Sequence, residues 1–416
     1  MKVCLLCYRG NPYAGGQGIY LFHLARELFG LGHEVEVIVG RPYPRYLGRW
    51  ARVHKLRNRN LWGVYRGEWL REGRPLGMLA PWNLFEFAAT RLRFFPEPFS
   101  FSLRALGLLG GLLRRGRFDV IHDIQTLGYG IWAMRAFGLP LVTTVHHPLT
   151  VDRRESFARD RTLGERYNTA AFFPVTMQGR VIRRMDRVIT ASAAGKAEIV
   201  REFRVRPERI SIVPNGVDLE TFRNPGGISR AEASLLFVGN TDDVRKGTRY
   251  LLDALQRLPS EVTLRIVDDP YPRKTLMPME VERRGLSGRV TFTGKLSPEA
   301  LVGEYCRCTL LVQPSLYEGF GLPAAEAMAC GAPIVAAGSG AVGEVVTPQA
   351  GVLVPPGDGE ALAGAIGALL AAPARRRSMG EAGVREAVAR FSWPDSARGV
   401  VEVYRRAVAE RYGAAA

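Results

Sequence analysis

A glycine-rich segment in the second half of the chain carries the residue types best suited to chemistry. It begins at Ser315, includes Glu318 and Glu326, and is expected to pass from a strand through a loop into a helix with Pro323 in its first turn. Backbone N–H groups and the positive dipole end at a helix start favour diphosphate or sugar hydroxyls. Glu326, one turn into the helix, would face such a ligand, where a carboxylate can accept two hydrogen bonds from a ribose diol. The alternative interpretation of this segment is a tight loop with two solvated glutamates. That interpretation does not explain why the segment is rich in glycine.

The pattern of apolar residues predicts the elements that would position this segment. Strand, glycine-bearing loop, helix and strand follow one another over residues 3–39, with Gly32 where a helix C-cap belongs, and form a βαβ unit. Strand-like runs then recur with helical patterns between them, at 119–121, 141–145, 187–190, 210–213, 235–238, 262–267, 290–293, 310–313, 333–336 and 351–354. This alternation predicts an α/β fold whose parallel sheets are covered by helices on both faces.

Two domains are expected because 416 residues exceed what one hydrophobic core usually organises. The turn-rich stretches 214–218 and 224–227 mark the boundary between them. We therefore predict an N-terminal domain over 1–213, a C-terminal domain over 214–394, and a terminal helix over 395–416 that crosses back to the first domain.

Residues 41–117, rich in Arg, Trp, Phe and Pro, fit the alternation less well and are interpreted as an insertion in the first domain. Within this stretch, leucines at helical spacing over 102–117 lead into Arg114 and Arg115. Such a helix either faces a core with a solvated basic end or lies on a membrane surface, and the sequence leaves both alternatives open.

The formal net charge of +17 is confined to the first half of the chain. Residues 1–215 hold 34 Lys and Arg against 17 Asp and Glu, whereas residues 216–416 hold 23 of each kind. A surface of one sign indicates an anionic partner for the first half: membrane phospholipid, a phosphorylated acceptor or nucleic acid. The hydrophobic content of 47% excludes wholesale disorder.

Cysteine usage and hydropathy favour a chain that folds in a reducing compartment and does not span a membrane. The five cysteines are too few and too oddly spaced for a disulfide framework. Cys4 and Cys7, three apart in a strand, would point to opposite faces, so core cysteines are expected rather than a redox pair. The N-terminus lacks signal-peptide features, and no apolar run of about 18 residues is free of charges. We expect a cytoplasmic location, with the inner face of the plasma membrane as an alternative.

The segment from Glu318 to Glu326, in its Glu-Gly-Phe-Gly-Leu-Pro context, resembles the Glu-x7-Glu motif of the retaining glycosyltransferases of family 4. That family has the GT-B fold, in which two Rossmann-like domains face a cleft. The resemblance covers nearly the whole chain outside 41–117, and further motifs that carry it lie at 15–16, 143–146, 214–218, 238–247 and 291–294. It implies a GT-B enzyme of the α/β class whose second domain binds the nucleotide sugar.

The resemblance also implies roles for individual residues. Lys246 would neutralise the leaving diphosphate, His146 would touch the transferred sugar, and Glu318 would hold sugar hydroxyls, so these three form the expected catalytic set. Glu326 would hold the ribose, and the base would lie near Leu296. The expected donor-binding set comprises Gly15, Gly16, Asn240, Arg245, Lys246, Leu296, Glu318, Gly319, Phe320, Gly321, Leu322 and Glu326.

One position departs from the family pattern. The Arg that often precedes the Lys by six residues is replaced by Asn240, whose side chain can donate a hydrogen bond but carries no charge. Either Arg245 substitutes for the missing cation, or stabilisation of the leaving group rests on Lys246 and the helix dipole.

The mechanism implied by the resemblance is a front-face internal return, in which the leaving phosphate itself takes the acceptor proton. Such a reaction needs positioning and charge stabilisation rather than a protein nucleophile. Covalent attack by Glu318 remains an alternative, as does proton abstraction by His146, Asp123 or His147.

No metal and no cofactor are expected, and the nucleotide diphosphate sugar serves as the donor substrate. The acidic pairs at 242–243 and 268–269 lack the Asp-x-Asp spacing of metal-dependent transferases. A dinucleotide oxidoreductase is disfavoured because residues 15–18 do not follow Gly-x-Gly-x-x-Gly. A nucleic-acid-binding protein is also disfavoured, because such a function would not explain the Glu-x7-Glu segment. A phosphorylase or a nucleotide-sugar epimerase would share the same fold.

The sequence therefore predicts a retaining hexosyltransferase that moves a sugar from a nucleotide diphosphate to an acceptor hydroxyl, in the synthesis of glycolipid, polysaccharide or cell-envelope glycan. The acceptor is expected to be anionic or lipid-linked and to bind the basic first domain. Peripheral contact with an anionic membrane and a soluble anionic acceptor are the open alternatives, and no nucleic-acid partner is expected.

Overall fold

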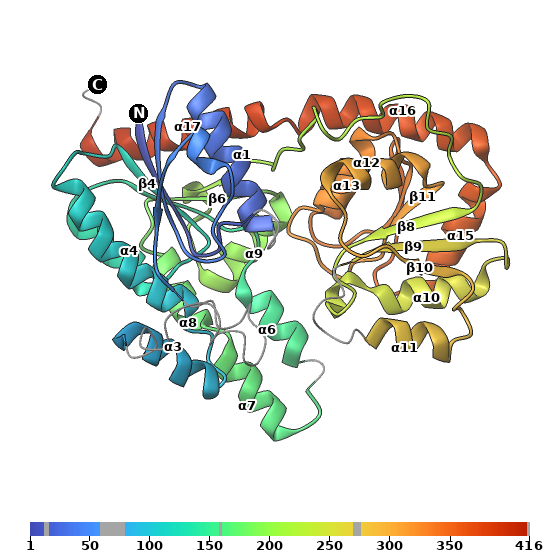
Figure 1. The fold of residues 1–416 in the computed structure, drawn as a ribbon, viewed down its shortest axis with the longest axis horizontal. Coiled ribbons are helices and arrows are strands. Elements are labelled where there is room, and N and C mark those ends of the chain that lie inside the picture. Colours follow the sequence, from blue (N-terminus) through green and yellow to red (C-terminus); the bar gives the residue numbers. More distant parts are fainter. Residues whose placement is uncertain (12–15, 59–79, 158–159, 269–275, 414–416) are drawn as a thin grey trace. The chain divides into compact units, whose positions relative to one another are not determined.

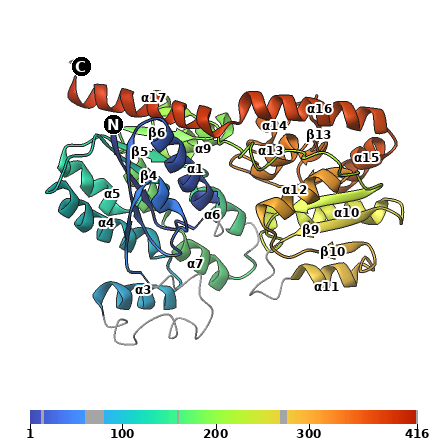
Figure 2. The same cartoon turned by 45° about the horizontal axis from the view of Figure 1, so that its top comes forward.

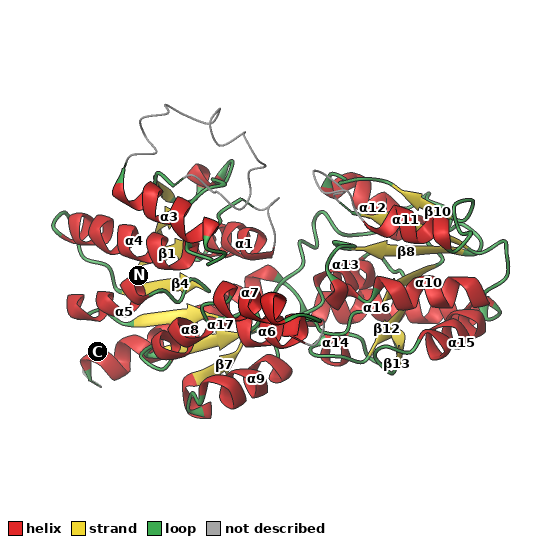
Figure 3. Cartoon of the chain, turned by 90° about the horizontal axis from the view of Figure 1, so that it is seen from below, coloured by secondary structure: helices red, strands yellow, loops and turns green. Residues whose placement is uncertain are grey.

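Apolar stretches of the chain form the strands of two parallel sheets, and the segments between them form helices that flank each sheet (Figure 1). The computed structural model describes all residues except 12–15, 59–79, 158–159, 269–275 and 414–416. The chain divides into a first unit of residues 1–191, 195–213 and 396–416 and a second unit of residues 192–194 and 214–395. Figure 3 shows strands and helices alternating in both units.

The first unit contains a seven-stranded sheet of order β3-β2-β1-β4-β5-β6-β7, in which all neighbours are parallel. Its strands are β1 (Lys2–Cys7), β2 (Glu34–Val39), β3 (Arg52–Lys55), β4 (Val120–Ile124), β5 (Leu141–Thr144), β6 (Arg187–Thr190) and β7 (Ile210–Ile212). The strand order reverses direction between β1 and β4. This is the topological switch point, where ligands bind beyond the carboxyl ends of the strands in open α/β sheets.

Helices cover both faces of the first sheet. They are α1 (Gly16–Gly30), α3 (Pro81–Arg91), α4 (Glu97–Leu113), α5 (Tyr129–Ala133), α6 (Leu149–Phe157), α7 (Leu163–Phe172), α8 (Val175–Ile182), α9 (Ala193–Phe203) and α17 (Trp393–Tyr412), with 3₁₀ turns η2 (Leu47–Arg49), η4 (Met134–Phe137) and η5 (Pro207–Arg209). Among the described residues, every helix is too short or too polar to cross a bilayer.

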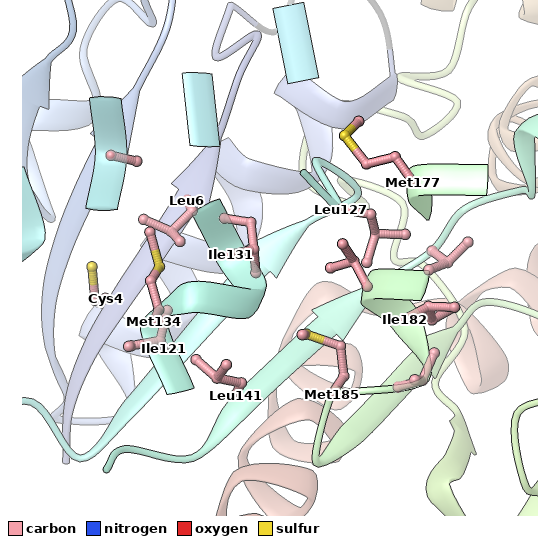
Figure 4. Close-up of a cluster of buried hydrophobic side chains, with 14 of the residues drawn as sticks. Cys4, Leu6, Ile121, Leu127, Ile131, Met134, Leu141, Met177, Ile182 and Met185 are labelled. Atoms are coloured by element: carbon pink, nitrogen blue, oxygen red, sulfur yellow. The ribbon is translucent and has the colours of Figure 1, made fainter. Parts of the chain in front are cut away.

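One face of the first sheet is packed by α4, α5 and α8. Figure 4 shows Leu6, Ile121 and Leu141 of the sheet meeting Ile131 of α5 and Ile182 of α8 in this core. Cysteines are part of the packing rather than of a cross-link, because all five are free and buried. This confirms the expectation of core cysteines.

The opposite face of the sheet is held by a buried chain of polar groups. The Tyr404 hydroxyl of α17 lies 2.6 Å from His122 Nδ1, and His122 Nε2 lies 2.7 Å from Thr144 Oγ1. Thr144 Oγ1 in turn lies 3.1 Å from the Tyr20 hydroxyl of α1. Figure 2 shows α17 on the side of the strands away from α4 and α5. Four elements of the first unit, α17, β4, β5 and α1, are thus joined through side chains.

Part of the stretch 41–117 is integral to the first unit, so its interpretation as an insertion is wrong for those residues. Arg52–Lys55 form β3, which pairs with β2 at the edge of the sheet. α4 buries Phe101 and Leu109 in the core and ends in an exposed basic pair, which is one of the two alternatives predicted for it. The strand was missed because its sequence, Arg-Val-His-Lys, has a single apolar residue and little burial.

The second unit repeats this architecture with a six-stranded parallel sheet of order β10-β9-β8-β11-β12-β13. Its strands are β8 (Ser234–Val238), β9 (Thr263–Val267), β10 (Val290–Phe292), β11 (Leu310–Gln313), β12 (Ile334–Ala337) and β13 (Gly351–Val354). Its helices are α10 (Thr248–Arg257), α11 (Leu276–Arg283), α12 (Pro298–Arg307), α13 (Leu322–Ala329), α14 (Val342–Val345), α15 (Gly359–Leu370) and α16 (Pro373–Arg390), with a 3₁₀ turn η6 (Val244–Lys246). The predicted fold class, two α/β domains with parallel sheets, is confirmed. The switch point of the second sheet lies between β8 and β11.

Candidate functional site

A tight turn after β8 positions Lys246 in the second unit. The Asp243 side chain accepts a hydrogen bond from Arg245 N and caps η6, which ends at Lys246. Gly247 follows with φ of 67°, and a Cβ there would lie 2.0 Å from the Pro314 carbonyl oxygen. Only glycine fits this position, so the close approach to the chain after β11 holds the lysine at the switch point.

Lys246 forms an ion pair with Glu318, which lies in the loop after β11. Lys246 Nζ lies 2.7 Å from Glu318 Oε1. The same oxygen accepts hydrogen bonds from Ser315 Oγ at 2.8 Å and from Gln313 Nε2 at 3.2 Å. Burial by itself raises the pKa of Glu318, but the Lys246 charge and these hydrogen bonds outweigh it, so the pKa lies below the ordinary value. Glu318 is therefore a carboxylate held ionised and in one orientation.

The backbone around Glu318 is fixed by the loop before α14. Ala341 N donates a hydrogen bond of 3.0 Å to the Glu318 carbonyl oxygen. The neighbouring Gly340 has φ of 54°, and a Cβ on it would lie 2.4 Å from that oxygen. The carboxylate is consequently supported from β11 and from the chain that follows β12.

The next residues form the start of α13. Gly321, with φ of 96°, is the N-cap, and its carbonyl accepts from Ala324 N. Phe320 is buried against Phe391 with ring centroids 5.5 Å apart, and the Gly319 carbonyl accepts from Ser192 Oγ at 3.1 Å. The turn at Phe320–Leu322 thus directs backbone N–H groups of a helix start toward the carboxyl edge of the sheet, as anion or hydroxyl binding requires.

Glu326 lies one turn into α13 and is 8% exposed. Its Oε2 accepts a hydrogen bond of 2.8 Å from the hydroxyl of Tyr305, a fully buried residue of α12. Burial raises the pKa of Glu326 to about 7, and the Tyr305 hydrogen bond opposes that rise. Glu326 is therefore a buried carboxyl group that titrates near neutral pH.

Arg245 and Lys246, the two cations that the sequence left as alternatives, pair with different carboxylates. Arg245 Nε and Nη2 donate to the two carboxylate oxygens of Asp243 at 2.9 and 2.6 Å. Asn240 is exposed, and its side-chain oxygen accepts from Asp242 N within the turn. Lys246, in contrast, forms the ion pair with Glu318, although the Glu318 charge also acts on Arg245. Leu296 lies in the loop after β10, directly before the Ser297 N-cap of α12.

His146 follows β5 in the first unit and packs edge-on against Tyr20, with ring centroids 4.9 Å apart. Its backbone N–H donates to Gln125 Oε1 at 2.7 Å, while its Nε2 is buried and has no hydrogen-bond partner among the described residues. Burial, with a smaller contribution from His147, lowers the pKa of His146 to about 3. A neutral imidazole with so low a pKa is a poor general base at pH 7 but can form a hydrogen bond to a ligand.

The rival general bases are engaged within the first unit. Asp123 accepts hydrogen bonds from Thr126 N, Leu127 N and Thr143 Oγ1, and burial raises its pKa to about 6. His147 Nε2 lies 3.1 Å from an Asp152 carboxylate oxygen.

Of the two glycines in the expected donor-binding set, Gly15 lies outside the described residues. Gly16 is the exposed first residue of α1, and among the described residues no atom lies within 4 Å of the position that a Cβ would take. Gly16 begins the helix that follows β1, and β1 is one of the two strands at the switch point of the first sheet.

Within the second unit the structure therefore brings together Lys246, Glu318 and the start of α13, with Glu326 one turn further. Sequence reasoning assigned no role to Gln313, Ser315 or Tyr305. Polar residues at the end of a buried strand could have indicated Gln313 and Ser315, whereas Tyr305 gave no such signal because a buried tyrosine in a helix is ordinarily core. Among the described residues, no group of three or more His, Cys, Asp or Glu is placed to hold a metal ion.

The fold and this site define a glycosyltransferase, and comparison with known proteins gives the family. A family model described as Glycosyltransferase Family 4 matches residues 14–221, and one described as Glycosyl transferases group 1 matches residues 232–372. The first match includes the stretch 41–117. The chain belongs to glycosyltransferase family 4, and its expected membership in this family is confirmed.

Particular relatives extend this result. The chain is 40% identical to an MMP alpha-(1->4)-mannosyltransferase of Mycolicibacterium hassiacum over 414 residues, which covers 98% of this chain and 99% of the relative. It is 32% identical to a D-inositol 3-phosphate glycosyltransferase of Xylanimonas cellulosilytica, over 71% of this chain and 74% of that protein.

Solved structures agree on the fold. A sucrose-phosphate synthase of Thermosynechococcus elongatus superposes with a TM-score of 0.77 at 25% identity, covering 98% of this chain and 99% of that chain. Anabaena HepE in complex with UDP and glucose gives a TM-score of 0.69 at 21% identity, covering 98% and 100%. The protein is a glycosyltransferase with the GT-B fold. The comparisons do not favour the alternatives, which were a nucleic-acid- or membrane-binding protein or another GT-B enzyme such as a phosphorylase or an epimerase.

Proposed function

We propose that the second unit binds a nucleotide diphosphate sugar at the carboxyl edge between β8 and β11, and that the enzyme transfers the sugar with retention of configuration. The observation that carries the proposal is the Lys246–Glu318 pair, at 2.7 Å, beside the N-terminus of α13. A cation, an oriented carboxylate and helix-start N–H groups together match the diphosphate and the hydroxyls of such a donor.

Each group has a distinct task in the proposed reaction. Glu318 accepts hydrogen bonds from sugar hydroxyls, and Lys246 moves its charge onto the diphosphate as negative charge develops there. The bond between the anomeric carbon and the phosphate oxygen breaks, the bond to the acceptor oxygen forms on the same face, and the acceptor proton passes to the leaving phosphate. Glu326 accepts hydrogen bonds from the ribose, and the nucleobase of the donor binds near Leu296.

In the first unit the residues proposed to bind substrate are Gly16, through phosphate, and His146, through a sugar. His146, neutral at pH 7 because of its low pKa, would serve as a hydrogen-bonding group rather than as a base. No metal is required in this scheme because Lys246 and the α13 start supply the positive charge. Activity that survives treatment with EDTA would support this point, and activity restored only by a divalent cation would overturn it.

The transferred sugar is proposed to be mannose. The support is the 40% identity to a mannosyltransferase over 98% of the chain. The test is thermal unfolding with GDP, UDP, ADP and the corresponding sugar conjugates, because a ligand at 100 times its Kd adds about 2.7 kcal/mol to the native state. A shift with one nucleotide and its mannose conjugate, followed by product formation, is expected; the absence of any shift would remove the donor site.

A finer proposal concerns the acceptor side: the first unit makes peripheral contact with an anionic membrane at the cytoplasmic face. The supporting observation is the surface of α3 and the turn after it, where exposed large apolar side chains are followed by two arginines at the end of the helix. Trp82, Phe85 and Leu92 are 40%, 41% and 64% exposed beside Arg91 and Arg93. Aromatic and arginine side chains together suit the interface of an anionic bilayer.

Co-sedimentation with phosphatidylcholine vesicles, with and without phosphatidylglycerol, tests the membrane contact. The double variant Trp82→Ala, Phe85→Ala should lose vesicle binding, whereas Phe29→Ala, which removes a 52% exposed aromatic of α1, should retain it. Binding that does not depend on lipid charge would leave a soluble anionic acceptor as the proposal.

A further inference from the structure

A buried tyrosine supports the carboxylate that is proposed to hold the ribose. Tyr305 lies in α12, and its side chain is fully buried. Its hydroxyl donates to Glu326 Oε2 at 2.8 Å. The ring also packs on Phe222, with centroids 6.2 Å apart. Burying a phenol hydroxyl is unfavourable unless it is hydrogen-bonded, and here its partner is a functional carboxylate.

The surroundings of Glu326 offer little other support for a charge. Three free, buried thiols lie here: Cys330 at the end of α13, Cys306 in α12 and Cys308 directly after α12. The hydrogen bond to Cys330 lowers the pKa of Cys306 to about 7. Arg230 and Arg307 are cations of this region, and the Arg230 guanidinium donates to the carbonyl oxygens of Cys308 and Gly331 rather than to Glu326. Among the described residues, Tyr305 is the one hydrogen-bond partner of the Glu326 side chain.

We propose that Tyr305 is a positioning residue for donor binding: it holds Oε2 of Glu326, stabilises the carboxylate form, and leaves Oε1 for the ribose hydroxyls. This inference rests on the proposed function, because it takes Glu326 as the ribose ligand. Tyr305 itself does not touch the nucleotide. Its effect therefore reaches the ligand only through the orientation and ionisation of Glu326.

The change Tyr305→Phe isolates the hydroxyl, since the ring and its packing remain. Oε2 then loses its donor inside a buried environment, which favours the protonated form of the carboxyl group. Because burial raises the pKa of Glu326 and the hydroxyl lowers it, the pKa should rise in the variant. Lowering the pH protonates the carboxylate and so weakens nucleotide binding. In the variant this weakening should begin at a higher pH than in the wild type.

Isothermal titration of the full-length protein with GDP and with UDP, at pH values on both sides of 7, measures this effect. Tyr305→Phe should weaken the Kd of the nucleotide that binds by about five- to tenfold near neutral pH. It should also move the midpoint of the pH dependence upward. Glu326→Gln should weaken binding and remove that pH dependence, and adding Tyr305→Phe to Glu326→Gln should change the Kd little further.

Tyr404→Phe is the matched control. Tyr404 is as deeply buried as Tyr305 and also uses its hydroxyl in a hydrogen bond, but its partner is His122 of the first unit. Loss of that hydroxyl should leave the nucleotide Kd and its pH midpoint unchanged. Should Tyr305→Phe fail to fold, 3-fluorotyrosine at position 305 keeps the shape, makes the hydroxyl a stronger donor, and should move the midpoint downward.

The outcomes separate this inference from the function on which it rests. If Glu326→Gln weakens nucleotide binding but Tyr305→Phe changes neither the Kd nor the pH midpoint, Tyr305 is only a packing residue and the inference is overturned. If Glu326→Gln leaves binding unchanged, the ribose assignment itself fails and takes this inference with it. The proposal is supported if the midpoint of the pH dependence shifts upward in Tyr305→Phe and stays unchanged in Tyr404→Phe.

Discussion

At the scale of single residues, the site consists of two glutamates with opposite electrostatic settings. Glu318 pairs with Lys246 and accepts two further hydrogen bonds, so its pKa is lowered despite burial. Glu326 accepts a hydrogen bond from the neutral Tyr305 hydroxyl, and burial raises its pKa to about 7. Carboxylates whose environments push their pKa values apart take different tasks. The first can hold a hydroxyl at any physiological pH, whereas the second responds to pH near neutrality.

The first prediction at this scale is that Lys246→Ala lowers kcat by at least about 100-fold, because a positioned charge on a leaving group is a large term in such catalysis. The pKa of Glu318 should rise at the same time, since the Lys246 charge is the main influence that lowers it. Steady-state kinetics with the identified donor measures the effect. Lys55→Ala, at an exposed lysine that ends β3, is the control and should leave kcat unchanged. Equal kinetics in both variants would contradict the assignment of Lys246.

The second prediction concerns the stability cost of Glu326. Its folded pKa of about 7 exceeds the ordinary 4.5 of the unfolded chain, so stability is full below the unfolded pKa and falls as pH rises through the folded pKa. The loss is on the order of 3 kcal/mol and is complete above pH 7. Glutamine does not ionise, so the Glu326→Gln variant should not lose this unfolding free energy as the pH rises. Urea denaturation of wild type and variant should therefore give free energies of unfolding whose difference changes with pH over this window; a constant difference would refute the prediction.

At the scale of elements, the loops are what bring these residues together. Lys246 follows β8 and Glu318 follows β11, and these strands are neighbours although 72 residues separate the two side chains. The positive φ and crowded surroundings of Gly247 and Gly340 set the close approach of the loops. The motif residues could be predicted from sequence because their spacing is local. Gln313, Ser315 and Tyr305 could not be assigned roles, because their contacts depend on the pairing of strands and the packing of α12 on α13.

Strand pairing, which the sequence does not show directly, also explains why residues 41–117 were interpreted as an insertion. An edge strand is hydrogen-bonded on one side only, so β3 tolerates Arg, His and Lys and shows no apolar alternation. α4, in contrast, was expected from its leucine spacing, and the sequence left open which surface would cover its apolar side. The core of the first unit supplies that surface.

The prediction at this scale is a pair of glycine substitutions. Gly247 and Gly285 have nearly the same positive φ, 67° and 68°. A Cβ at Gly247 would lie 2.0 Å from Pro314 O, whereas at Gly285 no atom of the described residues would lie within 4 Å of it. Each Ala variant should lose about 1 kcal/mol from backbone strain. Gly247→Ala should in addition displace η6 and lower kcat at least about tenfold. Thermal unfolding and kinetics of both variants test this, and matching kcat values would show that the loop does not position Lys246.

At the scale of the whole molecule, the first unit is completed by residues from both ends of the chain. Residues 396–416 belong to it together with residues 1–191 and 195–213. Arg187 of β6 forms an ion pair with Glu410 of α17, and Arg411 Nε donates to the Gly138 carbonyl oxygen at 3.2 Å. The positive charge of the chain lies in residues 1–215, so the unit that α17 completes is also the basic one. Local sequence patterns predict the helix itself; its packing depends on contacts across more than 250 residues, such as Tyr404 with His122.

The last prediction follows from that contact. Tyr404→Phe leaves the buried Nδ1 of His122 without its partner, and burial already lowers the pKa of His122 to about 3, so protonation cannot relieve the loss at neutral pH. The variant should lose about 1–2 kcal/mol of unfolding free energy. Tyr412→Phe, at a 51% exposed tyrosine near the end of the same helix, should change stability by less than about 0.5 kcal/mol. Denaturant titrations of the two variants compare them directly. Equal losses would mean that α17 is held by its apolar face and its ion pairs, and that the chain of polar groups from Tyr404 to Tyr20 adds no stability to the first unit.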